Sequence, residues 1–477
     1  MNKTQQTKIQ SPKSKIAIIG SGFLGLTLAL RLVESGAKVT VYESAPEIGG
    51  LASAWQIGDV IWDKHYHVTL ASDAFTRKIV EEIGLGDEFE WVETRTGFYT
   101  DGKLVSMSNT LEFLQFPPLD LISKFRLGAT IFYASRVKDW KSLEKISVEG
   151  WLTRLSGKKT FEKMWKPLLK AKLGEAYRET SAAFIWATIQ RMYAARNSGL
   201  KKEMFGYVRG GYARVLEKFG ESLREKGVEI RLKSRVEKIK KIEGKIRIST
   251  AETAQNYKAE VQLNAAQNFS EIVVRPISPA TESFSEFDSV ILTCPSNVAA
   301  QICPQLTDTE KEKLSNVKYQ GIVCASVLLR KSLSNFYVTN ITDETPFTGI
   351  IEMSALVEKS RFGGNALVYL PKYVAPDDEL FDKTDAEIEE IFLDGLEKMY
   401  SHFDRKDVVA FKVSRIRQVF PLPILNYSEN IPGVKTSLEN VFIVNSAQIT
   451  NGTLNVNETV QLAERFFEEN LAADLRG

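Results

Sequence analysis

The chain has 477 residues, of which 43% are hydrophobic and 26% charged, and its 62 basic and 60 acidic residues leave a formal net charge of +2. This composition is ordinary for a globular protein, and the balanced charge supplies no basic surface for a nucleic-acid partner. A mean hydropathy of −0.17 excludes a protein with many membrane spans, and the composition excludes collagen, coiled coil and bulk disorder.

Cysteines and histidines are too few for the common metal and disulfide frameworks. Cys294, Cys303 and Cys324 are odd in number, and no two of them are spaced as Cys-x-x-Cys. The whole chain has 3 histidines. Neither a disulfide framework nor a metal site is therefore expected, and a reducing cytoplasm is the expected compartment.

The N-terminal region is predicted to hold a polar, disordered tail over residues 1–14 and then a strand and a helix. The apolar run over residues 16–30 is interrupted by three glycines and ends at Arg31. It is also shorter than the roughly 20 apolar residues of a membrane span. We therefore expect neither a signal peptide nor a membrane anchor here.

Strands and helices alternate along most of the chain. A strand over 15–19, a helix over 26–35 and a strand over 38–42 form a βαβ unit. Further strands are predicted over residues 205–208, 228–232, 235–239, 287–292 and 441–444. Further helices are predicted over residues 73–84, most of 120–195, from 210–211 to about 227, and 456–470.

Two other segments have a distinct pattern. Residues 98–107 are predicted to form a hairpin, because Asp101-Gly102 is a strong turn pair. Residues 240–287 are polar with short alternating stretches, which indicates an insertion of extra strands or a mobile flap.

A glycine motif, Gly20-x-Gly22-x-x-Gly25, lies between the first strand and the first helix. In a dinucleotide site, Gly20 permits the tight turn, Gly22 lets a pyrophosphate approach the backbone, and Gly25 lets helix and strand pack closely. Phe23 and Leu24 complete the turn, where the N–H groups of the helix start favour an anion. The alternative is a glycine-rich turn without a ligand.

An acidic residue completes this motif. Glu43 lies 23 residues beyond Gly20, at the end of the second strand, and Ser44 follows it. A carboxylate there can accept hydrogen bonds from both ribose hydroxyls of an adenosine and would repel a 2′-phosphate. The combination predicts a dinucleotide other than NADP.

A second glycine pair, Gly49-Gly50, follows the second strand within residues 47–52. At this point the sequence resembles the family of FAD enzymes that includes the amine oxidases, protoporphyrinogen oxidase and phytoene desaturase, with UDP-galactopyranose mutase as a more distant relative. The resemblance implies that the backbone of Gly49, Gly50 and Leu51 passes close to the FAD phosphates and ribityl chain. Glu47 and Leu51 flank the pair, where the family often has a basic residue.

Three later segments are similar to the family in the same order. Arg209-Gly210-Gly211-Tyr212 precedes a helix, residues 228–239 contain Val236, and residues 287–295 end in Cys294-Pro295. The resemblance implies that the backbone of Val236 bonds adenine and that Cys294 lies beside the flavin. Each segment alone would be a generic strand or turn.

The C-terminal match contains Asn445 after a strand and a helix that begins at Val456. The resemblance implies that Asn445 contacts the ribityl chain and that the helix start at Val456 faces flavin O2. Asn445-Ser446 stands where the family has a Gly-Asp pair. No cysteine is expected near this segment, so FAD is expected to be held without a covalent bond.

Two of the 3 histidines lie in His65-Tyr66-His67. The resemblance places this segment beside the isoalloxazine ring, where an imidazole can move a proton near neutral pH. Alternation along a strand would put His65 and His67 on one face and Tyr66 on the other. All three are candidate catalytic residues, and the alternative is that one or both histidines are structural.

Residues 110–140 contain a helix with an apolar face and basic flanks. The apolar side chains are Leu121, Ile122, Phe125, Ala129 and Phe132. In family members with lipophilic substrates this region lines the substrate cavity and touches a membrane, which allows peripheral membrane contact here. The favoured interpretation is a core helix with a solvated basic face. Other candidates for lining the cavity are Trp165, Trp186, Arg191, Tyr193 and Arg196.

The resemblance implies an α/β fold with a discontinuous Rossmann-type FAD-binding domain and a mixed helical and β-sheet substrate domain. The FAD-binding domain is predicted over residues 15–72, 203–300 and 431–477, and the substrate domain over 73–202 and 301–430. The implied function is an FAD-dependent oxidoreductase that transfers a hydride from a small, lipophilic organic substrate to flavin N5. A redox-neutral flavin isomerase or mutase and a non-catalytic flavin-binding protein are the alternatives.

Overall fold

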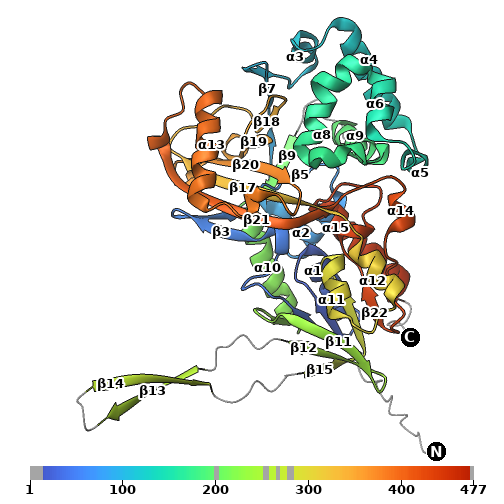
Figure 1. Cartoon of the computed structure of the whole chain (residues 1–477), viewed down its shortest axis with the longest axis vertical. Coiled ribbons are helices and arrows are strands. Elements are labelled where there is room, and N and C mark those ends of the chain that lie inside the picture. The colour runs from blue at the N-terminus through green and yellow to red at the C-terminus, as the bar shows by residue number, and fades with distance from the viewer. Residues whose placement is uncertain (1–13, 198–203, 251–256, 265–268, 277–283, 473–477) are drawn as a thin grey trace, which may run out of the picture.

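The computed structural model describes residues 14–197, 204–250, 257–264, 269–276 and 284–472. The predicted tail lies outside these residues except for Ser14. In Figure 1 a parallel sheet with its helices occupies the lower part of the molecule, and a larger mixed sheet with a group of helices occupies the upper part.

The parallel sheet brings together segments from both ends of the chain. Its strand order is β10 (Glu229–Arg231), β2 (Lys38–Tyr42), β1 (Lys15–Ile19), β16 (Ser289–Leu292) and β22 (Val441–Ile443). Every neighbouring pair is parallel. This is the Rossmann-type arrangement, so the predicted fold class is confirmed.

The two faces of this sheet are covered by different layers, as the alternation of β1 requires. Ile16 and Ile18 pack with helices α1 (Phe23–Glu34), α2 (Ala74–Glu82), α10 (Gly211–Glu225) and α15 (Val456–Asn470). Ala17 and Ile19 pack with the opposite layer. That layer is formed by β11 (Val236–Ile242), β12 (Lys245–Thr250), β15 (Phe284–Phe287), α11 (Ser296–Ile302) and α12 (Asp308–Ser315).

The polar region 240–287 contains the extra strands expected from its sequence. β12 and β15 pair with each other, and β13 (Tyr257–Asn264) pairs with β14 (Phe269–Pro276) as an antiparallel hairpin.

The mixed sheet has seven strands in the order β21-β17-β20-β19-β18-β7-β8. Their bounds are β21 (Val408–Pro421), β17 (Tyr319–Leu329), β20 (Ala366–Val374), β19 (Gly349–Glu352), β18 (Val338–Ile341), β7 (Thr96–Thr100) and β8 (Lys103–Ser106). β17 is buried at every position, because α13 (Asp385–Met399) packs on one face and the helical group on the other. β7 and β8 form the predicted hairpin, with Asp101 and Gly102 both at positive φ.

The prediction that most of residues 120–195 are helical is confirmed, within a helical region that spans residues 110–197. Its helices are α3 (Thr110–Gln115), α4 (Leu121–Arg136), α5 (Trp140–Leu143), α6 (Val148–Ser156), α7 (Lys158–Thr160), α8 (Lys166–Leu173) and α9 (Ala182–Asn197). The remaining elements are β3 (Ala54–Ile57), β4 (Val60–Asp63), β5 (Thr69–Leu70), β6 (Phe89–Glu93), β9 (Met204–Val208) and α14 (Tyr427–Asn430). The division into two discontinuous domains stays a prediction.

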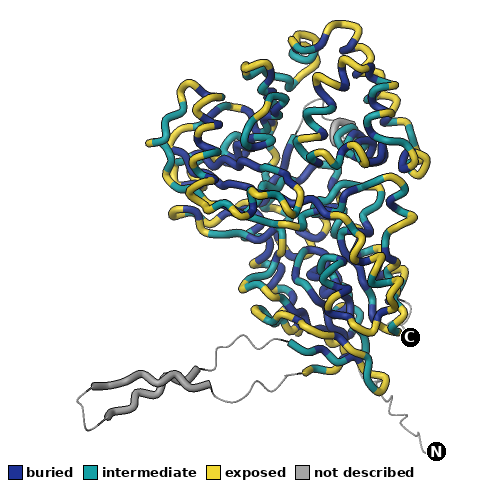
Figure 2. The backbone as a smooth tube through the Cα atoms, in the orientation of Figure 1, coloured by how far each residue is buried: buried dark blue, intermediate teal, exposed yellow. Residues whose placement is uncertain are grey.

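The apolar face of α4 does not pack into the core, so the favoured interpretation of this helix is wrong. Leu121, Ile122 and Phe125 are 74%, 75% and 78% exposed. The buried positions of α4 include Leu127 and even Lys124, whose ammonium donates to the Leu114 carbonyl at 2.7 Å. Figure 2 shows exposed stretches along α3 and α4 at the top of the molecule.

In the part of the chain that the structure describes, no helix combines the length and apolar character that crossing a bilayer requires. Within the same residues, no group of three or more His, Cys, Asp or Glu side chains is arranged to hold a metal ion.

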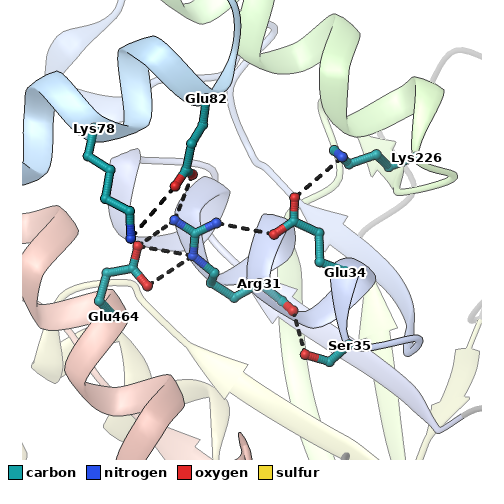
Figure 3. A network of polar contacts seen from close by, with 7 residues as sticks. All are labelled: Arg31, Glu34, Ser35, Lys78, Glu82, Lys226 and Glu464. Atoms are coloured by element: carbon teal, nitrogen blue, oxygen red, sulfur yellow. Dashed lines mark hydrogen bonds and ion pairs between the residues drawn. The ribbon is translucent and has the colours of Figure 1, made fainter.

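An ion-pair network joins three helices of the parallel-sheet layer (Figure 3). Arg31 on α1 donates to Glu464 on α15 through Nε at 2.9 Å and to Glu82 on α2 through Nη2 at 2.7 Å. The side chains of Arg31 and Glu464 are only 13% and 12% exposed. Removing one partner would leave the other charge poorly solvated, which costs more than loss of a surface pair.

We therefore expect Arg31→Ala to lower the free energy of unfolding by about 2 to 3 kcal/mol, measured by urea denaturation. The matched control is Arg178→Ala, which removes an exposed pair with Glu175 and should cost less than about 0.5 kcal/mol. Equal costs for the two variants would contradict the assignment of this network as a structural clamp.

Candidate functional site

A cavity of about 1490 Å³ runs from the β1–α1 turn to the start of α15 and reaches the helical group. Pockets for single small ligands are typically about 300–1,000 Å³, so this one has room for a long ligand and a second molecule. With the exception of Gly25, every residue proposed from sequence for FAD binding or catalysis lines it: Gly20, Gly22, Phe23, Leu24, Glu43, Ser44, Gly49, Gly50, Leu51, His65, Tyr66, His67, Val236, Cys294, Asn445 and Val456.

The three glycines of the first motif have different surroundings. A Cβ on Gly25 would lie 2.1 Å from the Gly20 carbonyl oxygen, and a Cβ on Gly20, whose φ is +108°, would lie 2.7 Å from Thr293 Oγ1. A Cβ on Gly22 would meet nothing within 4 Å, and its φ of −67° suits any residue. Gly20 and Gly25 are therefore required by the fold, whereas Gly22 leaves open space on the cavity side.

The second glycine pair lies directly against the first motif. Gly49 N–H donates to the Ser21 carbonyl at 2.8 Å, and Gly22 and Gly49 form an isolated parallel bridge. Gly50, at φ +57°, would place a Cβ 3.4 Å from Gly22 Cα. The two motifs thus form one continuous stretch of bare backbone in the cavity wall.

The N-terminus of α1 faces this stretch. Gly22 is its N-cap and supplies no side-chain hydrogen bond to the first turn. The N–H groups of that turn are the ones a helix leaves without an internal partner, and together with the helix dipole they favour an anion. This arrangement fits the diphosphate of a dinucleotide.

Glu43 is held in place by backbone and hydroxyl donors. One carboxylate oxygen accepts from Ser21 N–H at 2.9 Å and Ser21 Oγ at 2.7 Å, and the other accepts from Ala45 N–H at 2.9 Å. The carboxylate therefore braces the glycine turn and still lines the cavity beside Val236. Ser44 Oγ also donates to this carboxylate at 3.3 Å, so a ribose hydroxyl that binds Glu43 would take the place of one of these hydroxyl donors.

At the same carboxyl end of the parallel sheet, Asn445 ties the segments after β16 and β22 together. Its amide donates to the Cys294 carbonyl at 2.9 Å, and its carbonyl oxygen accepts from Ala447 N–H at 2.9 Å. The statement that no cysteine lies near the C-terminal segment is therefore wrong in three dimensions. Burial raises the pKa of the Cys294 thiol to about 12, so this side chain stays a protonated, poorly nucleophilic thiol near neutral pH.

The His65-Tyr66-His67 segment is not a strand, so the predicted alternation is wrong: the three residues form a bend and an irregular stretch after β4, and all three side chains line the cavity. His65 uses both ring nitrogens, with Nδ1 3.2 Å from the Leu51 carbonyl and Nε2 3.1 Å from Ser414 Oγ. His67 bonds the His65 carbonyl through Nδ1 at 2.9 Å. His65 is thus held by the protein on both sides, whereas His67 is held through Nδ1.

Burial lowers the pKa of His65 and of His67 to about 4. The hydrogen bond to the Leu51 carbonyl opposes this lowering of the pKa at His65, and at His67 the charge interaction with the neighbouring His65 adds to it. Both imidazoles are therefore neutral near pH 7. A neutral imidazole can accept a proton or a hydrogen bond, but these rings do not supply positive charge.

Sequence reasoning missed Lys172 on α8 and Tyr373 on β20, which both line the cavity. Lys172 Nζ donates to Tyr373 Oη at 2.6 Å. The signal was available in the helical spacing, because Lys172 lies three and four residues after Leu169 and Leu168 and so shares their apolar face. A lysine on an apolar helix face is unusual.

Of the other side chains considered for the cavity wall, Trp165 and Arg191 line it. Arg191 is paired with Asp73 at 2.8 Å. Trp186 and Tyr193 are not among the lining residues, and the Trp186 indole donates to the Val137 carbonyl at 3.0 Å. The side chain of Arg196 lies outside the described residues.

A family model described as flavin containing amine oxidoreductase matches residues 25–452 of the chain. Over 307 residues the chain is 24% identical to a protein of Synechococcus elongatus named "Probable zeta-carotene desaturase", covering 58% of this chain and 63% of that relative. Over 173 residues it is 24% identical to the mitochondrial protoporphyrinogen oxidase of Nicotiana tabacum, covering 34% of this chain and 33% of that relative. The chain thus spans less than two thirds of the length of these curated relatives.

Solved structures share the fold at low identity. A crystal structure of reduced UDP-galactopyranose mutase superposes with a TM-score of 0.69 at 14% identity, covering 97% of this chain and 95% of that chain. This likeness extends over nearly the whole chain and concerns the fold alone.

The two depressed histidine pKa values predict acid-sensitive stability. Below the ordinary histidine pKa of about 6.5, the unfolded chain binds protons that the folded protein binds only near pH 4, so stability is lost as the pH falls between these values. Each histidine should contribute about 1 to 2 kcal/mol of this loss between pH 8 and pH 5.

We therefore expect the double variant His65→Gln/His67→Gln to lose less stability than the wild type when the pH is lowered from 8 to 5, measured by urea denaturation at each pH. The control is His402→Gln at an exposed position, which should keep the wild-type pH dependence. An identical pH dependence in the double variant would show that these rings are not buried in the neutral form.

Proposed function

The chain belongs to the family of flavin-containing amine oxidoreductases, and on this premise we propose that it is an FAD-dependent oxidoreductase acting on a small, lipophilic organic substrate. The observation that carries the proposal is the continuous cavity that links the bare backbone at Gly22 to the His65–His67 segment and the start of α15. FAD is an elongated dinucleotide, and the cavity presents anion-binding and ribose-binding features at one end.

When bound, FAD supplies the two-electron chemistry that accepts a hydride at flavin N5. The protein contributes binding and orientation. The N-terminus of α1 and the backbone of Gly22, Gly49 and Gly50 would hold the diphosphate, and Glu43 the adenosine ribose. Asn445 and the start of α15 at Val456 would lie along the ribityl chain and flavin. A polar helix start there would favour negative charge on the reduced ring.

Tyr66 and the neutral His67 are the proposed groups nearest to the chemistry, with His65 as their support. His67 can accept a proton or a hydrogen bond at Nε2, because its Nδ1 is committed to the His65 carbonyl. Tyr66 bonds Tyr373 at 2.9 Å, which links the histidine segment to the far wall of the cavity. These residues can therefore orient a substrate, and His67 carries a positive charge only while it holds a proton that it has accepted.

The far wall of the cavity supports a lipophilic substrate. Its side chains include Leu168, Leu169, Phe184, Ile185, Ile322, Ile351 and Phe420. The names of the curated relatives refer to a carotene and a porphyrinogen, which agrees with an organic substrate of this kind. Burial of apolar surface would provide most of the binding free energy.

FAD is proposed to bind without a covalent link. Cys294 is the cysteine that lines the cavity, and burial raises the pKa of its thiol to about 12. A thioether to the flavin would need a reactive thiolate at this position.

A redox-neutral flavin isomerase or mutase is the second candidate, because the mutase shares the fold over nearly the whole chain. Product analysis under anaerobic conditions separates the two. An oxidoreductase converts one substrate per reduced FAD and then stops, whereas an isomerase turns over repeatedly without consuming an oxidant. A protein that holds FAD and reduces it with none of the lipophilic substrates tested would be a non-catalytic flavin-binding protein.

The exposed face of α3 and α4 is proposed to contact a phospholipid bilayer. Its large apolar side chains are Leu111, Leu114, Leu121, Ile122, Phe125, Phe132 and Tyr133, each at least 49% exposed. Arg126 and Arg136 lie on the same helix, and the Arg136 guanidinium lies 5.0 Å from the ring centre of Phe132. Apolar side chains with interspersed basic groups are typical of a helix that lies in the membrane interface.

For the cofactor site, we expect Gly22→Val to fold normally and to be purified with less than about a tenth of the wild-type FAD content, because its side chain would occupy the space where the diphosphate lies. The measurement is the flavin absorbance per protein after denaturation. Gly128→Val is the control, since a Cβ there also meets nothing within 4 Å but lies on α4. Wild-type FAD content in Gly22→Val would refute the proposed binding mode.

For the membrane face, we expect the triple variant Leu121→Ser/Ile122→Ser/Phe125→Ser to lose at least tenfold in affinity for vesicles of phosphatidylcholine and phosphatidylglycerol, measured by co-sedimentation. The control is Val409→Ser/Leu425→Ser, which removes exposed apolar side chains outside α3 and α4. Failure of the wild-type protein to sediment with these vesicles, or an equal loss in both variants, would rule the contact out.

A further inference from the structure

Lys172 carries an ammonium group on an otherwise apolar part of the cavity wall. Its Nζ donates to Tyr373 Oη at 2.6 Å and lies 5.0 Å from the ring centre of Phe420. Tyr373 Oη is in turn 2.9 Å from Tyr66 Oη. A short chain of three polar groups therefore runs from α8 to the histidine segment.

Among the described residues, no carboxylate lies within ion-pair distance of the Lys172 ammonium. Desolvation by burial lowers its pKa to about 7, and no acidic group opposes the shift. Arg191 also lines the cavity with a cationic side chain, but its charge is already neutralised by Asp73 at 2.8 Å. A charge in such surroundings is costly unless a partner of opposite sign is supplied.

Lys172, Tyr373 and Tyr66 together carry more hydrogen-bond donors than their contacts with one another use. The ammonium carries three polar hydrogens and each phenol carries one, and the contacts within the chain use one hydrogen per bond. Whichever tyrosine donates to the other, one phenol hydrogen and two ammonium hydrogens remain. The group that completes the site must therefore be an acceptor, and a carboxylate has about four acceptor positions and no donor.

The surroundings define the rest of the ligand. The same cavity is lined by apolar side chains, among them Leu168, Leu169, Trp165 and Ile322. One uncompensated ammonium matches a single negative charge, which favours a carboxylate over a doubly charged phosphate. Since Tyr66 belongs to the segment proposed to lie beside the flavin, a molecule anchored here would place its apolar body along the same part of the cavity.

We propose that Lys172, with Tyr373 and Tyr66, forms a subsite for the carboxylate of a lipophilic substrate. The inference rests on the proposed function and narrows its substrate class from lipophilic molecules in general to lipophilic carboxylic acids. Lys172 is a substrate-positioning residue in this arrangement, and Tyr373 orients its ammonium.

The test compares dodecanoate with 1-dodecanol as probes for the FAD-loaded protein, by isothermal titration calorimetry at pH 6.5. We expect the wild type to bind the acid at least tenfold more tightly than the alcohol. Lys172→Met should lose this preference, because its affinity for the acid falls at least tenfold while its affinity for the alcohol changes by less than about twofold. Tyr373→Phe should lower the affinity for the acid by a smaller factor, because the Lys172 ammonium remains.

The matched control is Lys170→Met on the same helix, since Lys170 is exposed and paired with Glu175 at 2.6 Å. It should keep the wild-type preference. Three results would overturn the subsite. They are equal affinity of the wild type for acid and alcohol, no binding of either probe, and an unchanged preference for the acid in Lys172→Met. FAD content is measured in the same samples. A wild-type protein with normal FAD content and no carboxylate preference contradicts the subsite alone, whereas a wild-type protein that binds no FAD contradicts the proposed function.

Discussion

The hydrogen bond from Gly49 N–H to the Ser21 carbonyl holds two glycine-rich turns in contact, and the candidate site depends on that contact. Side chains at Gly20, Gly25 or Gly49 would collide with other parts of the protein, so the fold itself excludes them. The groups they would meet are Thr293, the Gly20 carbonyl and Leu216, respectively. Gly22 is different, because space remains open above it. The result is a wall of bare backbone at a helix N-terminus. Such a surface can bind a diphosphate.

Burial controls the chemistry of the rest of the cavity. Desolvation keeps His65 and His67 neutral and the Cys294 thiol protonated, so these groups shape the wall and exchange hydrogen bonds without carrying charge. Lys172 is the exception, since it brings an amine into the same environment without an acidic partner among the described residues. In this part of the cavity, the position of a charge on a bound molecule becomes a source of specificity.

The helix α4 shows where sequence patterns mislead. Its spacing of Leu121, Ile122 and Phe125 is that of an amphipathic helix, and most such helices bury their apolar face. Here the opposite face packs inward, and the ammonium of Lys124 satisfies the Leu114 carbonyl. Periodicity identifies a helix and its two faces, but the packing partners decide which face meets solvent.

The sequence by itself determined the βαβ unit, the glycine turn, Glu43, the hairpin at Asp101-Gly102 and the final helix, because each depends on local backbone preferences and short-range spacing. Only the tertiary structure decided that Cys294 lies beside Asn445, that His65 uses both ring nitrogens, and that Lys172 meets Tyr373 and Tyr66. These contacts join residues up to 349 positions apart along the chain, as His65 and Ser414 show. Their geometry and desolvation arise when distant elements pack together, and no local pattern encodes them.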